Sequence, residues 1–317
     1  MNKRIAVFAL CIAALVAIVA VGCAPKQRFI TIGTGGTAGT YFPLGGALAE
    51  IWNKNIKGMN ANATSTGASA ANIAMLKDAK VDVIFVQNDA AFYAMNDLEA
   101  YKGKAMPDIR GLASLYDETC QLVALADSKI KAVGDLKGKR VSVGAAGSGV
   151  EANARQILEA AGLTYNDIKV QYLSFAESAS NLKDGNIDAA FNTAGAPTAA
   201  IQDLAASKKI VLVPIDGDVA AALMKKWAFY TPTKIAAGTY QGVDADVMTV
   251  SVKSMLAVSA KADPKLVYDM LKTMFANGER LAASHKKGAD IKLATATDGM
   301  SIPLHPGAEK FYKENKK

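Results

Sequence analysis

The sequence predicts an α/β protein of two lobes, each a mixed sheet flanked by helices, with a hinge between them. A unit of strand, glycine loop, helix and strand occurs twice along the chain. Alternation of strands and helices indicates parallel sheets covered by helices. The length of 317 residues is more than one compact core usually needs, which favours two lobes over one.

The two copies of the repeated unit match at both of their ends. Residues 29–40 and residues 140–149 each run from an apolar strand into a glycine loop. Residues 75–85 and residues 181–191 each read as a helix end, a turn and an apolar strand. Ligands of open α/β sheets bind beyond the carboxyl ends of the strands, which is where both glycine loops would lie. Two such lobes facing each other would enclose a cleft.

The chain is expected to cross between the lobes twice. Residues 112–116 and 121–125 read as a strand pair that leads into the second lobe, and the return is expected near residues 210–214 and 230–240. A helix beginning with Asp263 as N-cap would pack on the first lobe. The predicted organisation is a signal peptide at 1–22, a tether at 23–28, lobe 1 at 29–115 and 225–317, and lobe 2 at 116–224.

The N-terminus has the features of a bacterial lipoprotein signal. Lys3 and Arg4 precede an uninterrupted apolar run at residues 5–21, and Gly22 then precedes Cys23. A small residue directly before a cysteine resembles a lipobox, so Cys23 is expected to be the acylated first residue of the mature chain. The protein would then lie in the periplasm or at the outer face of the cytoplasmic membrane. A retained membrane anchor is the alternative, because the run is close to the shortest that spans a bilayer.

Composition and charge exclude several classes of protein. With 51% hydrophobic and 7% aromatic residues, the chain is not disordered, collagen-like or a coiled coil. The formal net charge of +7 falls to +5 when the signal leaves, and the lysines are scattered among acidic residues. No nucleic-acid groove is therefore expected. Cys120 would be the one cysteine without a lipid in the mature chain, so no internal disulfide can form.

Both glycine loops suit an anionic group. Main-chain N–H groups at a helix start can point at one oxyanion, the helix dipole favours negative charge, and glycine lets a ligand approach. A plain strand-to-helix turn is the alternative for each loop. A dinucleotide site is not favoured, since residues 58–69 contain no Asp or Glu after the first loop. Residues 134–139 are one residue short of a phosphate-binding P-loop.

Catalysis has little support in this sequence. His285 and His305 are far along the chain from the glycine loops and are not spaced as a helical metal-ligand pair. Ser148 is not in a G-x-S-x-G elbow. Asp117 and Glu118 are interpreted as solvated neighbours on a loop. We therefore expect no catalytic residue, no metal and no cofactor.

Polar side chains collect at the predicted binding edge. Residues 64–69 form a polar loop whose Ser or Thr could cap the next helix. The following strand ends at Gln87 and Asp89. Asp89 could accept hydrogen bonds from a ligand ammonium or could act as a helix N-cap. The Tyr41 ring could form a wall of the pocket or lie in the core.

Read together, these segments resemble the TAXI family of solute-binding proteins, the TRAP-transporter-associated extracytoplasmic immunogenic proteins. The resemblance covers nearly the whole mature chain and rests on the order and spacing of segments at 33–41, 43–46, 87–89, 144–149, 153–158, 195–197, 237–240 and 302–307. It implies a type II periplasmic-binding-protein fold that closes on a small organic acid or amino acid. It also implies delivery to a TRAP membrane permease, with glutamate, glutamine or a 2-oxo dicarboxylate as ligand.

The resemblance also implies a set of ligand-binding residues by matched position. No arginine is an obvious clamp for a carboxylate, and Arg155 reads as structural. The two rival interpretations are an enzyme acting on a small anionic substrate on the same fold, and a surface lipoprotein without a small ligand. The implied ligand-binding residues are Gly36, Thr40, Tyr41, Thr66, Gly67, Ser69, Gln87, Asp89, Gly147, Ser148 and Gly149.

Overall fold

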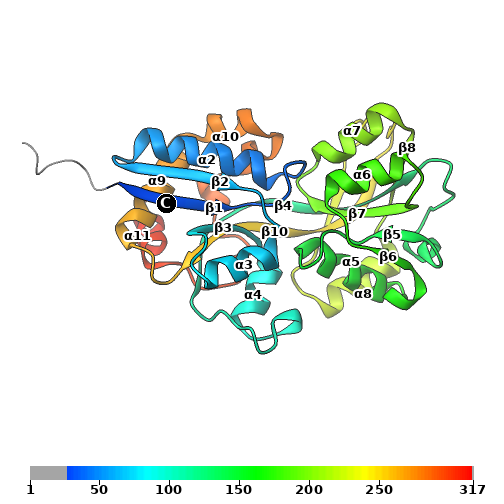
Figure 1. The fold of residues 1–317 in the computed structure, drawn as a ribbon, viewed down its shortest axis with the longest axis horizontal. Helices are drawn as coiled ribbons and strands as arrows, with labels where there is room; N and C mark the ends of the chain where they lie inside the picture. Colours follow the sequence, from blue (N-terminus) through cyan, green and yellow to red (C-terminus); the bar gives the residue numbers. More distant parts are fainter. Residues whose placement is uncertain (1–26, 316–317) are drawn as a thin grey trace, which may run out of the picture.

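The computed structural model describes residues 27–315, so the predicted signal peptide and Cys23 lie outside the described residues. Two lobes lie side by side, and the strands β4 (Ile109–Leu125) and β10 (Val247–Ser259) run between them (Figure 1). Each lobe combines a mixed sheet with helices on both faces. The predicted two-lobed α/β fold class is confirmed. Within residues 27–315, every helix is too short or too polar to cross a membrane.

The first lobe is a sheet between two layers of helices. Its strand order is β2 (Met59–Thr64), β1 (Arg28–Gly33) and β3 (Val83–Gln87), followed by β10 and β4. β1 is parallel to β2 and β3, and β10 is antiparallel to β3. The helices are α2 (Tyr41–Asn55), α3 (Ser69–Lys77), α4 (Asn88–Met95), α9 (Pro264–Ala276), α10 (Gly278–Ser284) and α11 (Pro306–Asn315), with the short helices η1 (Glu99–Tyr101), η4 (Lys286–Asp290) and η5 (Leu293–Thr295).

The continuous apolar run of β3 explains the two helical layers. Successive side chains of a strand point to opposite faces of the sheet. Val83 and Phe85 pack in the core beneath α2 and α9, whereas Ile84 and Val86 pack in the core beneath α3 and α4. The four consecutive apolar residues of β3 are therefore buried on both faces of the sheet, as parallel strands usually are.

The second lobe repeats this arrangement. Its strands β7 (Ala189–Ala194), β5 (Arg140–Ser142) and β6 (Lys169–Gln171) follow β4 in that order, and β8 (Ile210–Val213) also pairs with β4. β9 (Thr231–Ile235) pairs with β10. The helices are α5 (Gly149–Ala160), α6 (Phe175–Lys183), α7 (Ala199–Ser207) and α8 (Gly217–Lys226), with η2 (Val133–Leu136) and η3 (Tyr165–Asp167). α6 and α7 cover one face, and α5 and α8 the other.

The first crossing between the lobes is one continuous strand. β4 pairs with β10 from Ile109 to Thr119 and then with β7 from Thr119 to Ala124. The prediction of two strands at 112–116 and 121–125 was therefore wrong. The intervening polar residues interrupt the apolar pattern, but their backbones remain in the β ladder with β10 and β7.

The second crossing is β10, which lies later in the chain than predicted. Val250 and Val252 pack in the core of the second lobe, and Leu256 packs in that of the first. Trp227 and Tyr230 also belong to the core of the second lobe, so the chain has not yet returned at residue 225, where we expected lobe 1 to resume. The β8 segment and residues 230–240 stay with the second lobe for the same reason.

Helix α9 begins as predicted. The Asp263 side chain accepts a hydrogen bond from the Lys265 N–H at 2.9 Å, and Pro264 occupies the first helical turn. Leu266, Met270 and Met274 recur on one face of α9 and are buried in the core of the first lobe. The prediction that this helix packs on the first lobe is confirmed.

Candidate functional site

A pocket of about 80 Å³ lies between the two lobes. It occupies the carboxyl ends of the parallel strands, where ligands of α/β sheets bind. A single water needs a cavity volume of only about 10–15 Å³, so the pocket can hold a small molecule. Its lining residues are Gly35, Gly36, Gly39, Thr40, Tyr41, Thr66, Gly67, Ala68, Ser69, Gln87, Glu118, Ala145, Ser148, Gly149, Val150, Ser174, Phe175, Thr193 and Ala194.

Most of the residues implied by the resemblance meet in this pocket. Both glycine loops contribute, so segments more than 100 residues apart in the chain face one another. Asp89 and Gly147 are the two that do not line it. Both lie within two residues of a lining residue in the sequence. Asp89 is in the first turn of α4, where its side chain forms a buried contact with Asn153 outside the pocket. The nine implied residues in the lining are Gly36, Thr40, Tyr41, Thr66, Gly67, Ser69, Gln87, Ser148 and Gly149.

Five helices begin at this pocket. The lining includes the first residue or the N-cap residue of α2, α3, α4, α5 and α6. The Ser148 and Ser174 hydroxyls cap α5 and α6, whereas no side chain caps α2 or α3. The predicted Ser or Thr cap of α3 was wrong, because Ala68 occupies the N-cap position at φ 66°. Helix starts carry partial positive charge, so their convergence favours an anionic group.

One acidic side chain lies among these helix starts. Glu118 is 2% exposed and lines the pocket, and its Oε2 accepts a hydrogen bond from Gln87 Nε2 at 3.0 Å. No lysine, arginine or histidine is found among the lining residues given above. Burial raises the pKa of Glu118 to about 7, while the neighbouring Tyr41 hydroxyl and the Gln87 amide oppose this rise.

The interpretation of Asp117 and Glu118 as a solvated loop pair was wrong for Glu118. Both residues lie in β4, and neighbouring side chains of a strand point to opposite faces. Asp117 points outward and forms an ion pair with Lys253 at 2.6 Å, whereas Glu118 points into the pocket. Continuing the strand through residues 116–121 would have revealed this difference.

Asp89 is buried in the contact between the lobes. Its Oδ1 accepts a hydrogen bond from the Ala90 N–H at 2.7 Å, and its Oδ2 accepts one from Asn153 Nδ2 at 3.2 Å. Burial raises its pKa to about 6, and these hydrogen bonds oppose the rise. Asn153 Nδ2 also donates to the Tyr230 hydroxyl at 2.8 Å. Asp89 therefore has partners within the protein for both of its oxygens.

Direct hydrogen bonds hold the lobes in a closed arrangement. Gln87 Nε2 in the first lobe donates to Asn153 Oδ1 in the second at 3.1 Å. At the rim of the cleft, Thr40 Oγ1 donates to the Gly195 carbonyl at 3.2 Å, and the Ala200 N–H donates to the Ala38 carbonyl at 3.3 Å. Opening the lobes would break these bonds and expose the pocket.

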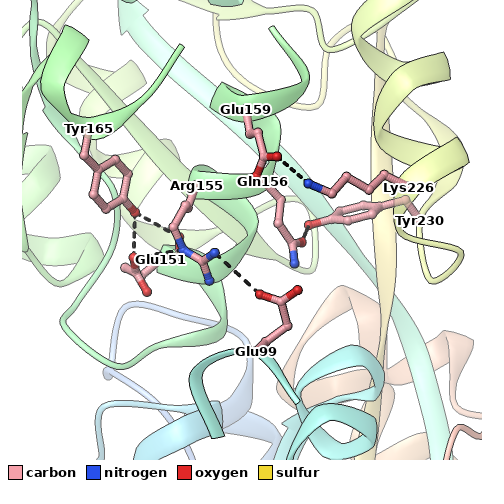
Figure 2. A network of polar contacts seen from close by, with 8 residues as sticks. All are labelled: Glu99, Glu151, Arg155, Gln156, Glu159, Tyr165, Lys226 and Tyr230. Carbon is pink, nitrogen blue, oxygen red and sulfur yellow. Dashed lines mark hydrogen bonds and ion pairs between the residues drawn. The ribbon is translucent and has the colours of Figure 1, made fainter. Parts of the chain in front are cut away.

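Arg155 takes part in a separate contact between the lobes. Figure 2 shows it extending from α5 between Glu151 of the same helix and Glu99 of η1 in the first lobe. The ion pairs span 3.7 Å to Glu99 and 3.9 Å to Glu151, and all three side chains are partly exposed. Tyr165 donates to Glu151 Oε1 at 2.7 Å and completes the group. Arg155 does not line the pocket, in agreement with its interpretation as structural.

Two lobes joined by a pair of crossing strands, with a pocket between them, define the fold of the periplasmic binding proteins. The family model for the NMT1-like family matches residues 32–315, and the chain belongs to this family. The match covers both lobes and nearly all of the described residues.

Solved structures share this fold at low sequence identity. A putative L-cystine ABC transporter protein from Listeria monocytogenes is 19% identical, with a TM-score of 0.51 over 84% of this chain and 98% of that one. A protein from Bordetella bronchiseptica RB50 is 15% identical, with a TM-score of 0.56 over 90% and 82%. A Xanthomonas citri protein solved with ATP is 12% identical, with a TM-score of 0.50 over 91% and 95%.

We expect Gly149→Ala to hinder closure of the lobes. A Cβ atom there would lie 2.0 Å from Gln87 Oε1 and 2.5 Å from Gln87 Cδ, and the hydrogen bonds to Glu118 and Asn153 prevent the Gln87 amide from moving away cheaply. Small-angle X-ray scattering should show a larger radius of gyration for Gly149→Ala. The control is Gly46→Ala in α2, where no atom lies within 4 Å of the new methyl group. Wild-type dimensions for Gly149→Ala would contradict the expectation.

Glu118 should make the stability of the protein depend on pH. The pKa of Glu118 is raised from 4.5 to about 7 on folding, so the folded state keeps a proton that the unfolded state loses between these values. Stability should therefore fall as the pH rises from about 4.5 to about 7, by an amount of the order of 3 kcal/mol, and then level off. Urea unfolding at several pH values should show that Glu118→Gln removes this part of the dependence. Asp117→Asn is the control, and parallel curves for wild type and Glu118→Gln would refute the assignment.

Proposed function

We propose that the protein is an extracytoplasmic substrate-binding lipoprotein of a TRAP transporter. It captures a small organic acid or amino acid between its lobes and delivers the ligand to the membrane permease. Glutamate, glutamine or a 2-oxo dicarboxylate is the proposed ligand, and a lipid on Cys23 holds the protein at the outer face of the cytoplasmic membrane. The observation that carries the proposal is the convergence of five helix starts from both lobes on one pocket between them.

The helix starts supply what a carboxylate needs. α2 and α3 have no side-chain cap, so N–H groups of their first turns are available to an anion. Ser69 adds a hydroxyl group from the same side, since its oxygen accepts from the Gln87 N–H and its hydrogen is free to donate, and Gly149 faces it from the other lobe. A carboxylate placed here would contact both lobes at once. Such a ligand binds the closed state better than the open state and shifts the population toward closure.

The resemblance to the TAXI family supports the choice of a TRAP permease over other transporters. The Gly33 to Tyr41 loop, the Gly144 to Gly149 loop and the Gly195 to Pro197 segment carry this resemblance, and all three approach the cleft between the lobes. An enzyme on the same fold is the second candidate class. It would convert its ligand, whereas a receptor would release the ligand unchanged.

We expect Gly36→Asp to abolish the binding of organic acids. Nothing lies within 4 Å of a Cβ atom at Gly36, so the variant can fold, but its carboxylate would occupy the pocket and repel an anion. Thermal unfolding with L-glutamate, L-glutamine or 2-oxoglutarate should show an increased Tm for the wild-type protein, by several degrees near saturation. The same ligands should leave the Tm of Gly36→Asp unchanged.

Gly46→Asp on α2 provides the control, because it adds the same charge outside the pocket lining. Mass spectrometry of the bound fraction should recover the ligand unchanged. If none of these acids raises the Tm of the wild-type protein, or if Gly36→Asp responds to them as strongly as wild type does, the proposed function is wrong. Conversion of the ligand would favour the enzyme.

A further inference from the structure

Gln87 leaves one buried acceptor without a partner in the pocket. Its side chain is 2% exposed, and its Nε2 donates to Glu118 Oε2 and to Asn153 Oδ1. These two acceptors determine the orientation of the amide, because the reverse orientation would place its oxygen against the Glu118 carboxyl oxygen. Gln87 Oε1 therefore points the other way, over Gly149, and accepts no hydrogen bond within the described chain.

Glu118 places a second acceptor in the same lining. Its Oε2 is used by Gln87, and its carboxyl is buried at a site with no lysine, arginine or histidine among the lining residues. A buried carboxylate without a cationic partner is costly. The helix starts elsewhere in the lining have the opposite character, since they offer N–H donors. The pocket is thus polarised, with acceptors at Gln87 and Glu118 and donors at the starts of α2 and α3.

A ligand that satisfies both ends must be dipolar. Gln87 Oε1 and Glu118 call for a group with several N–H donors and a positive charge, which describes a primary ammonium. The helix starts call for a carboxylate. A keto oxygen cannot donate a hydrogen bond, so a 2-oxo acid would leave Gln87 Oε1 unpaired and would place a dipole of the wrong sign beside Glu118.

We propose that Glu118 and Gln87 form the subsite for the ammonium group of an α-amino acid whose carboxylate lies at the starts of α2 and α3. This inference rests on the proposed function and narrows its ligand from organic acids in general to amino acids. Glu118 sets the specificity by its charge, and Gln87 adds a directed hydrogen bond. Asp89 is excluded from this role, because it lies outside the pocket and its oxygens bind Ala90 and Asn153.

The test compares amino acids with the 2-oxo acids of the same carbon skeleton. Isothermal titration calorimetry would measure L-glutamate against 2-oxoglutarate, L-alanine against pyruvate, and L-leucine against 4-methyl-2-oxopentanoate. The wild-type protein should bind the amino acid of at least one pair 100-fold or more tighter than its partner, since a site built around a hydrogen-bonded group strongly rejects an analogue that lacks it. Glu118→Gln should reduce that ratio at least tenfold.

Two further variants separate specificity from folding. Glu118→Asp keeps the charge on a shorter side chain and should retain a preference for the amino acid, with weaker affinity. Asp89→Asn removes the neighbouring buried charge outside the pocket and should leave the ratio unchanged. Because the ratio is taken within one protein, a general loss of stability in a variant does not alter it. The ratio of affinities for the amino acid and the 2-oxo acid is also measured on the wild-type protein, where no substitution affects folding.

The outcomes distinguish this inference from the proposed function. Equal or tighter binding of the 2-oxo acids by the wild-type protein would overturn the ammonium subsite and leave the receptor function standing. An unchanged ratio in Glu118→Gln would remove Glu118 from the subsite, and a ratio that collapses in Asp89→Asn would assign the role to Asp89 instead. If none of the six compounds nor L-glutamine binds, the proposed function itself fails.

Discussion

The side chain of Gln87 is the point at which the pocket, the crossing strands and the second lobe meet. Its amide donates to Glu118 on β4 and to Asn153 on α5, while its backbone N–H donates to the Ser69 hydroxyl at the start of α3. A buried polar group that loses its partner costs far more than the net gain from making the bond. The positions of Glu118, Asn153 and Gly149 therefore depend on one another, and the closed cleft is the arrangement that satisfies them together.

The pocket combines two electrostatic environments that would conflict for a simple anion. Five helix starts favour negative charge, whereas Glu118 and the free Gln87 oxygen favour positive charge. The rise in the pKa of Glu118 to about 7 shows the cost of burying a carboxyl here without a cation. A dipolar guest resolves the conflict by orienting along the pocket. The same polarity determines the orientation of the bound ligand, which a cavity lined only by donors or only by acceptors would not do.

The fold could be predicted from the sequence because it follows from a repeated local pattern, and the resemblance pointed to nine of the residues that line the pocket. The repeated strand and glycine loop fixed the lobes, and the loops then brought Thr40, Ser69 and Gly149 together. Glu118 could not be found in this way, because its burial depends on β4 continuing through polar residues. Pairing with β10 and β7 keeps these residues in the strand. Asp89 was placed in the site because it follows a buried strand. The turn into α4 instead directs it to Asn153, which only the docking of the two lobes decides.

Two of the contacts between the lobes differ in what they can contribute to closure. Arg155 and Glu99 are each partly exposed and lie 3.7 Å apart, and ion pairs in contact with water stabilise a structure only weakly. The bonds among Gln87, Asn153 and Asp89 are buried, so they are stronger, but water replaces each of them when the cleft opens. Neither contact can therefore commit the lobes to the closed state by itself. A ligand held at Gln87, Glu118 and the starts of α2 and α3 also meets Ser148 and Gly149 at the start of α5 in the second lobe. The contacts with α5 exist in the closed state alone, which makes closure a response to the ligand.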